Sequence, residues 1–213
     1  MIRLSALCVT LCLSTSLHAA PLAFDGSWRE QGFFRLFSND YVQRDTALDV
    51  ISDGTVSILY RPVPTSEWSA TKATWAWQVE EGVAPTDLTL RGGDDRNLAV
   101  YFVFADRETA EDLNPRRLRR LLRNPNIRVL AYVWGGDHTR GEFLPSPYLD
   151  TRGVTIIRRP AGTGSHGETV DLSADLTRAF GQRPEVLIGV AVSADSDDTD
   201  AKINARISGL TLN

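Results

Sequence analysis

Trp75-Ala76-Trp77-Gln78-Val79, followed by Arg91-Gly92-Gly93-Asp94-Asp95 and the apolar run Leu98 to Phe104, decides the fold of this chain. Trp75, Trp77 and Val79 alternate with smaller or polar residues, as in a β-strand with one buried face. The run Leu98 to Phe104 is apolar at both parities, which is typical of a central strand buried on both faces. The sequence therefore predicts a β-structure built around these two strands.

Other runs extend this pattern along the chain. Ile127 to Trp134 and Val186 to Val192 are also apolar at both parities and predict two more central strands. Val154 to Arg158 is shorter and leads into Arg159-Pro160, which predicts an edge strand. In the last run, Ile203 to Leu212, the apolar parity changes across Ser208-Gly209, which predicts a β-bulge there.

Turns and helices complete the predicted architecture. Asp53-Gly54 joins Thr46–Ser52 to Thr55–Arg61 and predicts a hairpin. One helix is predicted after the capping Asn114 and Pro115, ending at Asn124, and another from Ser173 to Phe180, ending at Gly181. We therefore predict an all-β fold, an antiparallel β-sandwich of jelly-roll or galactose-binding-like type with one or two short connecting helices.

The N-terminus has the features of a secretory signal peptide. Arg3 precedes an apolar run from Leu4 to Leu17, and a cut after Ala19 avoids leaving Pro21 at the first mature position. We expect a signal peptide at 1–19 and a single domain at 20–213, located in the periplasm or, as second choice, secreted. No later run reaches the roughly 20 apolar residues of a membrane span, so we predict a soluble monomer without a transmembrane segment.

Cysteine content and charge exclude several classes of function. Cys8 and Cys12 both lie in the predicted signal peptide, so the mature chain would have no disulfide, no catalytic thiol and no thiolate metal ligand. The formal charge of −4 becomes −5 when Arg3 leaves, because residues 1–19 contain no acid. An acidic chain is not expected to bind nucleic acid or an anionic membrane as its main partner.

Several of these stretches together resemble a known family. They are the Trp-x-Trp-x-Val strand, the Gly-Asp-Asp turn, the strand Tyr101 to Phe104, Leu130 to Gly135, Phe180-Gly181 and Asp195 to Thr199. The pattern resembles domain-of-unknown-function 3047, a family of exported bacterial proteins whose activity is unassigned and for which no catalytic residues are known. The resemblance implies a sandwich similar to galactose-binding-like and jelly-roll modules, in which sugars and calcium are frequent ligands.

The acidic segment Asp195-x-Asp197-Asp198-x-Asp200 has the carboxylate density that Ca²⁺ prefers. It is not an EF-hand, because Asp200 stands where the loop requires Gly and Arg206 where it requires Glu. The alternative is a polar turn in which Asp side chains bond to their own backbone. We take Asp195, Asp197 and Asp198 as candidate calcium ligands and predict no other cofactor.

The second acidic turn, Gly93-Asp94-Asp95, either caps the following strand or binds a ligand. Antiparallel pairing of Leu98–Phe104 with Val186–Val192 would bring Asp94 and Asp95 close to the Asp195 segment, near the Trp134 to His138 loop. Carboxylates so close together repel one another, so we expect either a cation or an arginine partner such as Arg91 or Arg96.

A tryptophan at a strand end can provide a flat stacking surface for a sugar ring. Trp residues on an alternating face usually belong to the core, but Trp134 is followed by Gly135-Gly136-Asp137-His138, and we expect it to be exposed. The candidate ligand-binding residues are Asp94, Asp95, Trp134, Asp137 and His138.

Three hypotheses for function follow. The first is a non-catalytic module that binds carbohydrate or a cell-envelope glycan. The second is a glycoside-active enzyme, in which Asp94 or Asp95 would lie about 5 Å, or about 6.5 to 9.5 Å, from Asp195 or Asp137. The third is a structural envelope protein that binds another protein through an exposed apolar patch. No HExxH motif includes His138 or His166, so a zinc protease is not expected.

Overall fold

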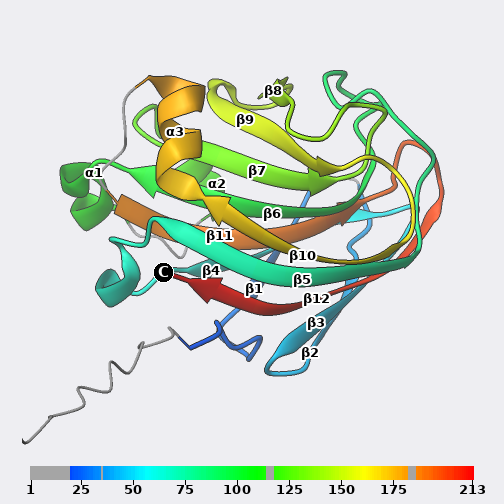
Figure 1. The fold of residues 1–213 in the computed structure, drawn as a ribbon, viewed down its shortest axis with the longest axis horizontal. Helices are drawn as coiled ribbons and strands as arrows, with labels where there is room; N and C mark the ends of the chain where they lie inside the picture. Colours follow the sequence, from blue (N-terminus) through cyan, green and yellow to red (C-terminus); the bar gives the residue numbers. More distant parts are fainter. Residues whose placement is uncertain (1–19, 35, 114–117, 182–185) are drawn as a thin grey trace, which may run out of the picture.

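The protein is an antiparallel-rich β-sandwich of jelly-roll type, seen in a computed structural model that describes residues 20–34, 36–113, 118–181 and 186–213. Figure 1 shows its two sheets one behind the other. The first sheet has seven strands, in the order β1 (Arg29–Gly32), β4 (Val56–Pro62), β11 (Val186–Asp195), β6 (Arg96–Ala105), β7 (Arg128–Trp134), β9 (Asp150–Arg159) and β8 (Phe143–Ser146). The second has five, in the order β10 (Gly164–Asp171), β5 (Lys72–Glu81), β12 (Lys202–Leu212), β3 (Ala47–Asp53) and β2 (Asp40–Gln43). Among the described strands, only β7 and β9 pair in parallel.

The interior between the sheets is rich in aromatic side chains. Trp75 and Trp77 of β5 are buried, as their alternation predicts. The Trp75 ring lies 6.2 Å from Phe102 of β6, and the Trp77 ring lies 5.6 Å from Trp134 of β7. These contacts join the two sheets through the strands that the sequence singles out.

The three predicted central strands are confirmed. β11, β6 and β7 are neighbours inside the seven-stranded sheet, and every residue of β11 is buried. The predicted edge strand is wrong, because β9 lies between β7 and β8. Its Ile156 and Ile157 point to opposite faces and are both buried, so β9 is covered on both faces.

The predicted hairpin at Asp53-Gly54 is also wrong, although the turn itself is present. Gly54 has a φ of 60° there, which suits glycine. However, β3 pairs with β12 and β2, whereas β4 pairs with β1 and β11. The turn therefore takes the chain from one sheet to the other, and turn chemistry alone does not reveal which strands pair.

The predicted bulge in the last strand is confirmed. The pairing of β12 with β5 shifts register between Ser208 and Thr211, and Gly209 has a φ of 60°. Ile207 before the bulge and Leu210 after it are both fully buried. The bulge thus keeps the apolar side chains of both halves directed into the core.

Short helices lie in the connections: the 3₁₀ helix η1 (Thr65–Glu67), α1 (Arg107–Asp112), α2 (Leu118–Leu122) and α3 (Leu172–Phe180). α3 ends at Gly181 in the left-handed conformation, as predicted. α2 confirms a helix in the predicted segment, with Leu118 and Leu121 buried, while Asn114 and Pro115 lie outside the described residues. α1 was not predicted; its cap is Asp106, whose carboxylate accepts a hydrogen bond from the Thr109 amide.

α1 and α2 cover part of the outer face of the seven-stranded sheet. Leu118 and Leu121 of α2 pack with Val103 of β6 and Val129 of β7, whose side chains point away from the sheet interface. None of the described helices is long and apolar enough to cross a membrane. The predicted signal peptide at 1–19 lies outside the described residues and stays a prediction.

Candidate ligand-binding groove and acidic cluster

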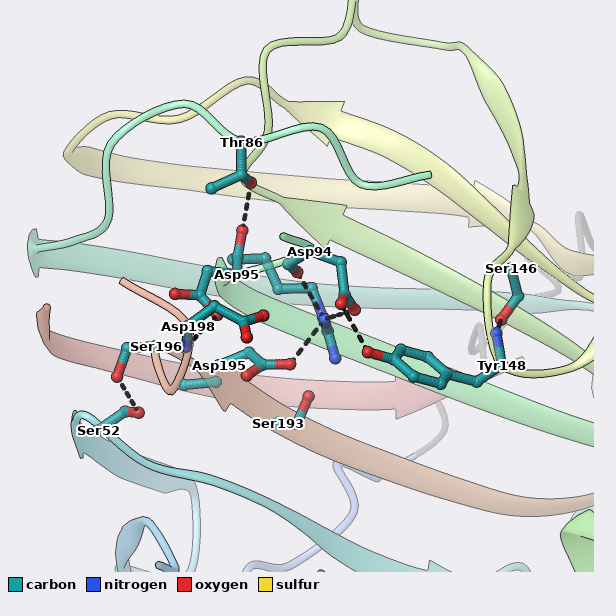
Figure 2. Close-up of polar contacts among 12 residues, drawn as sticks. Ser52, Thr86, Asp94, Asp95, Ser146, Tyr148, Ser193, Asp195, Ser196 and Asp198 are labelled. Atoms are coloured by element: carbon teal, nitrogen blue, oxygen red, sulfur yellow. Dashed lines mark hydrogen bonds and ion pairs between the residues drawn. The ribbon is translucent and has the colours of Figure 1, made fainter. Parts of the chain in front are cut away.

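The two acidic segments meet at one end of the sandwich. β6 begins where β11 ends, and Arg96 pairs directly with Asp195 across the two strands. Figure 2 shows Asp94, Asp95, Asp195 and Asp198 gathered at this end. The adjacent loop after β7 also approaches closely, because a Cβ on Gly135 would lie 2.8 Å from that of Arg96. The antiparallel pairing of these strands explains the placement.

Arg96 lies at the centre of this acidic end. Its Nη1 lies 3.0 Å from Asp94 Oδ2 and 2.9 Å from Asp195 Oδ2. Burial opposes the charge of the guanidinium, but Tyr101, Asp195 and Asp94 outweigh this effect and hold the pKa of Arg96 above its usual value. Arg96 is therefore a largely buried cation shared by two carboxylates.

Three hydroxyl groups extend these contacts. Arg96 Nη2 donates to the Tyr101 hydroxyl at 2.8 Å, which lies 3.0 Å from Ser193 Oγ. The Tyr148 hydroxyl donates to Asp94 Oδ1 at 2.7 Å, and in Figure 2 its ring points towards Asp94 from the loop after β8. We call Asp94, Arg96, Tyr101, Tyr148, Ser193 and Asp195 the Arg96 network.

Asp195 has the most perturbed environment of this network. Its Oδ1 is buried and has no hydrogen-bond donor among the described residues. Burial raises the pKa of Asp195 to about 9; Arg96 acts in the opposite direction, while Asp197 and Asp94 raise the pKa further. The guanidinium that Asp195 shares with Asp94 does not fully offset the burial of Asp195, so the pKa of this carboxyl stays above its usual range.

Asp95 stabilises the turn that follows β11. Its side chain is fully buried, and its Oδ2 accepts hydrogen bonds from the amide and hydroxyl of Thr199. Its Oδ1 accepts from the Asp198 amide at 3.3 Å. Asp95 therefore holds the turn after β11 against the beginning of β6.

Asp95, Asp197 and Asp198 form an acidic cluster, in which one carboxylate oxygen of each lies within 4.8 Å of the others. Burial, followed by Asp197, Asp95 and Asp94, raises the pKa of Asp198. The cluster offers oxygen ligands of the kind that Ca²⁺ takes. It includes the predicted ligands Asp197 and Asp198, with Asp95 where the sequence suggested Asp195, which instead contacts Arg96.

An open groove begins at the Arg96 network. It has a volume of about 440 Å³ and lies on the outer face of the seven-stranded sheet. Its floor consists of side chains from β4, β6, β7, β9 and β11, and its walls include Phe33 and Leu36 on one side and Ser146 to Leu149 on the other. α2 borders its far end with Leu118 and Leu122. A groove of this volume, lined by both polar and apolar side chains, is typical of a small-molecule site.

The family model for DUF3047, described as a protein of unknown function, matches residues 26–211. The chain belongs to the DUF3047 family. No curated protein matches it. Among solved structures, it is similar to the xyloglucanase domain of NopAA, a type three effector from Sinorhizobium fredii, in complex with cellobiose. The two chains are 9% identical, with a TM-score of 0.47, and the match covers 93% of this chain and 99% of that one. It is also similar to a thermostable cellulase derived from Cel12A of Rhodothermus marinus, with 13% identity and a TM-score of 0.48 over 88% and 96% of the two chains.

In this DUF3047 protein, the expectation of an exposed Trp134 is wrong. Its side chain is 1% exposed and packs between Trp77 and His166 in the core. The reason is its parity on β7, where Trp134 shares the inner face with Leu130 and Tyr132. Trp134 therefore offers no stacking surface to a ligand.

Asp137 and His138 lie near the acidic end but hold a loop. The Asp137 amide donates to the Thr86 carbonyl at 2.9 Å, and His138 Nε2 accepts from the Leu88 amide at 3.2 Å. Leu88 in turn lines the groove. Neither residue has a described contact with the Arg96 network, so they act on the groove through the 86–88 loop.

The sequence gives little sign of several residues of this DUF3047 site. Arg96 stands out only as a possible partner for the carboxylates, while Tyr101 lies within an apolar run and Ser193 directly follows one, as core residues do. Tyr148 lies 54 residues from Asp94 in the chain, and no local pattern links the two. Only the three-dimensional arrangement brings these side chains together.

Proposed function

We propose that this DUF3047 protein is a non-catalytic binding protein for carbohydrate and that the groove beside the Arg96 network holds the ligand. The observation that supports this most is an excess of hydrogen-bond acceptors over donors at one end of an open groove. The accessible carboxylates of Asp197 and Asp198 line it, next to the buried carboxylates of Asp94 and Asp195, which share Arg96 as their cation. Sugar hydroxyls donate hydrogen bonds to such acceptors.

The same end offers ring surface beside these acceptors. Tyr148 is 55% exposed and Phe33 is 41% exposed, and both line the groove. A sugar ring has apolar C–H faces and polar edges, so it can stack on Tyr148 while its hydroxyls reach the carboxylates. Tyr148 thus takes the role that the sequence suggested for Trp134.

The carboxylate geometry favours binding over glycoside hydrolysis. Asp94 Oδ2 and Asp195 Oδ2 each lie about 3 Å from the same nitrogen, so they are no more than about 6 Å apart. That spacing alone would suit a retaining enzyme, but the guanidinium occupies the space between the two oxygens, where a glycosidic bond would have to lie. Asp195 Oδ1 is also buried away from solvent.

The predicted signal peptide gives the proposal a location. If residues 1–19 direct export, the ligand is a glycan of the cell envelope and the protein acts in the periplasm. Mass spectrometry of the protein from a periplasmic extract tests this part. An N-terminus at Ala20 supports export, and a retained Met1 contradicts it.

The binding proposal is tested on a glycan array with purified residues 20–213. The array is run in buffers with and without Ca²⁺. We expect retention of a restricted set of glycans, weakened strongly by Tyr148→Ala and less by Tyr148→Phe, which keeps the ring and loses the hydroxyl. Val42→Ala is the matched control, because Val42 is exposed on β2 of the other sheet. Absence of binding contradicts the proposal, and release of reducing sugar from a bound glycan would assign the site to an enzyme instead.

A further inference from the structure

The groove has two chemically different parts along the strand direction. Near the first residues of β6 it is lined by the acidic groups of the Arg96 network and the cluster. Farther along β6 and β7 the lining is aliphatic, with Val103, Val129 and Ala131 on the floor and Leu118 and Leu122 of α2 above them. Thr155 is a polar exception among the described floor residues, and it is largely buried.

The groove is also long. Lining residues extend from Arg96 to Val103 along one strand, a span of roughly 23 Å at about 3.3 Å per residue. The small side chains of Ala131 and Ala191 leave space along the middle of the floor. A ligand that fills the groove must therefore change character from polar to apolar along its length.

A glycan alone does not match this surface. Each hydroxyl placed over the aliphatic floor would lose its bonds to water and find no partner there, which is unfavourable. A saturated hydrocarbon chain has no such groups and gains from burial. Resting on the proposed function, we infer that the natural ligand is an amphipathic glycoside, with its sugar at the Arg96 network and an acyl or alkyl chain on the aliphatic floor.

The border of the groove agrees with a ligand of this kind. Phe33 and Leu36 line it and are 41% and 42% exposed, and the nearby Phe37 is 80% exposed. Phe33 and Phe37 lie near the acidic end, because Gly32 pairs with Ser57 of β4 and the Val56 amide donates to the Phe37 carbonyl. Exposed apolar side chains there are suited to contact with a lipid surface that supplies the ligand.

The inference is tested by titrating residues 20–213 with methyl, hexyl and octyl β-glucosides. Each glucoside is kept below its micelle concentration. For a chain buried on the floor, we expect affinity to rise by up to about fourfold per added methylene. Leu122→Asp should remove most of this gain. Leu90→Asp is the matched control, because Leu90 is exposed and lies outside the groove lining.

The outcomes separate this inference from the proposed function. Equal affinities for the methyl and octyl glucosides overturn the amphipathic ligand and leave carbohydrate binding intact. A chain-length gain that survives Leu122→Asp places the chain elsewhere and also overturns it. Octanol that binds as tightly as octyl glucoside contradicts the sugar site itself. The wild-type series decides the question even if Leu122→Asp fails to fold.

Discussion

Arg96 is the residue on which the acidic end depends, because it is the cation that Asp94 and Asp195 share. Asp94 is 4% exposed, so its carboxylate has little access to water. Removing one partner of a buried ion pair leaves an uncompensated charge, which is far more costly than losing an exposed pair. This difference can be measured within the same chain.

We expect Arg96→Met to lower the free energy of unfolding by about 3 to 5 kcal/mol. The matched control is Arg44→Met, which removes an exposed ion pair with Asp49 and should cost no more than about 1 kcal/mol. Urea unfolding monitored by tryptophan fluorescence measures both. Equal losses in the two variants would mean that the network contributes nothing specific to stability.

Calcium binding at the acidic cluster stays a prediction. Asp95, Asp197 and Asp198 are close enough to share an ion, and beside Asp197 the buried Asp195 Oδ1 has no donor among the described residues. An ion bound only to the folded state stabilises it by about 2.7 kcal/mol at a hundredfold excess over its dissociation constant.

Ca²⁺ should therefore raise the melting temperature relative to EDTA, and Asp198→Ala should abolish the increase. Asp198 is exposed, so its loss should cost little stability otherwise. Asp40→Ala on β2 is the control and should respond to Ca²⁺ like the wild type. A wild-type melting temperature indifferent to Ca²⁺ leaves these side chains with the turn-forming role alone.

At the scale of elements, the bulge in β12 depends on one backbone conformation. Gly209 has a φ of 60°, and a Cβ there would meet no atom within 4 Å, so an alanine would be strained by its backbone and not by packing. We expect Gly209→Ala to lower the free energy of unfolding by about 1 to 2 kcal/mol.

Gly167→Ala on β10 is the control for this change. It also meets open space, without a positive φ, and should be neutral or slightly stabilising. Chemical denaturation of both variants measures the difference. If Gly209→Ala is as well tolerated as Gly167→Ala, the bulge does not depend on the left-handed conformation.

The elements show where sequence reasoning succeeds and where it stops. The spacing of apolar residues identified the central strands and the change of parity in β12, because both are local patterns within a single run of residues. Asp53-Gly54 identified a turn, but one partner of β3 is β12 and one partner of β4 is β11, each more than 100 residues away along the chain. Pairing of this kind depends on the packing of both sheets and has no local signal.

At the scale of the whole molecule, the fold class was predictable and the site only partly so. Placing the acidic segments at one end followed from antiparallel pairing of β6 with β11. The groove could not be predicted, because its floor consists of side chains from five strands, which look like ordinary core residues in the sequence. The expectation of an exposed Trp134 was wrong because its position at a strand end suggested exposure, whereas its parity on β7 directs the side chain into the core.

The most direct test of the central claim is to map bound carbohydrate by NMR, with isotope-labelled residues 20–213 titrated with the glycan that the array selects. We predict that backbone amide shifts concentrate at Leu88 to Arg96, Ser146 to Leu149 and Asp195 to Asp198, the segments that surround the acidic end of the groove. Shifts confined to the outer face of the five-stranded sheet, around Gln78 and Ser165, would contradict the claim, as would a spectrum that the glycan leaves unchanged.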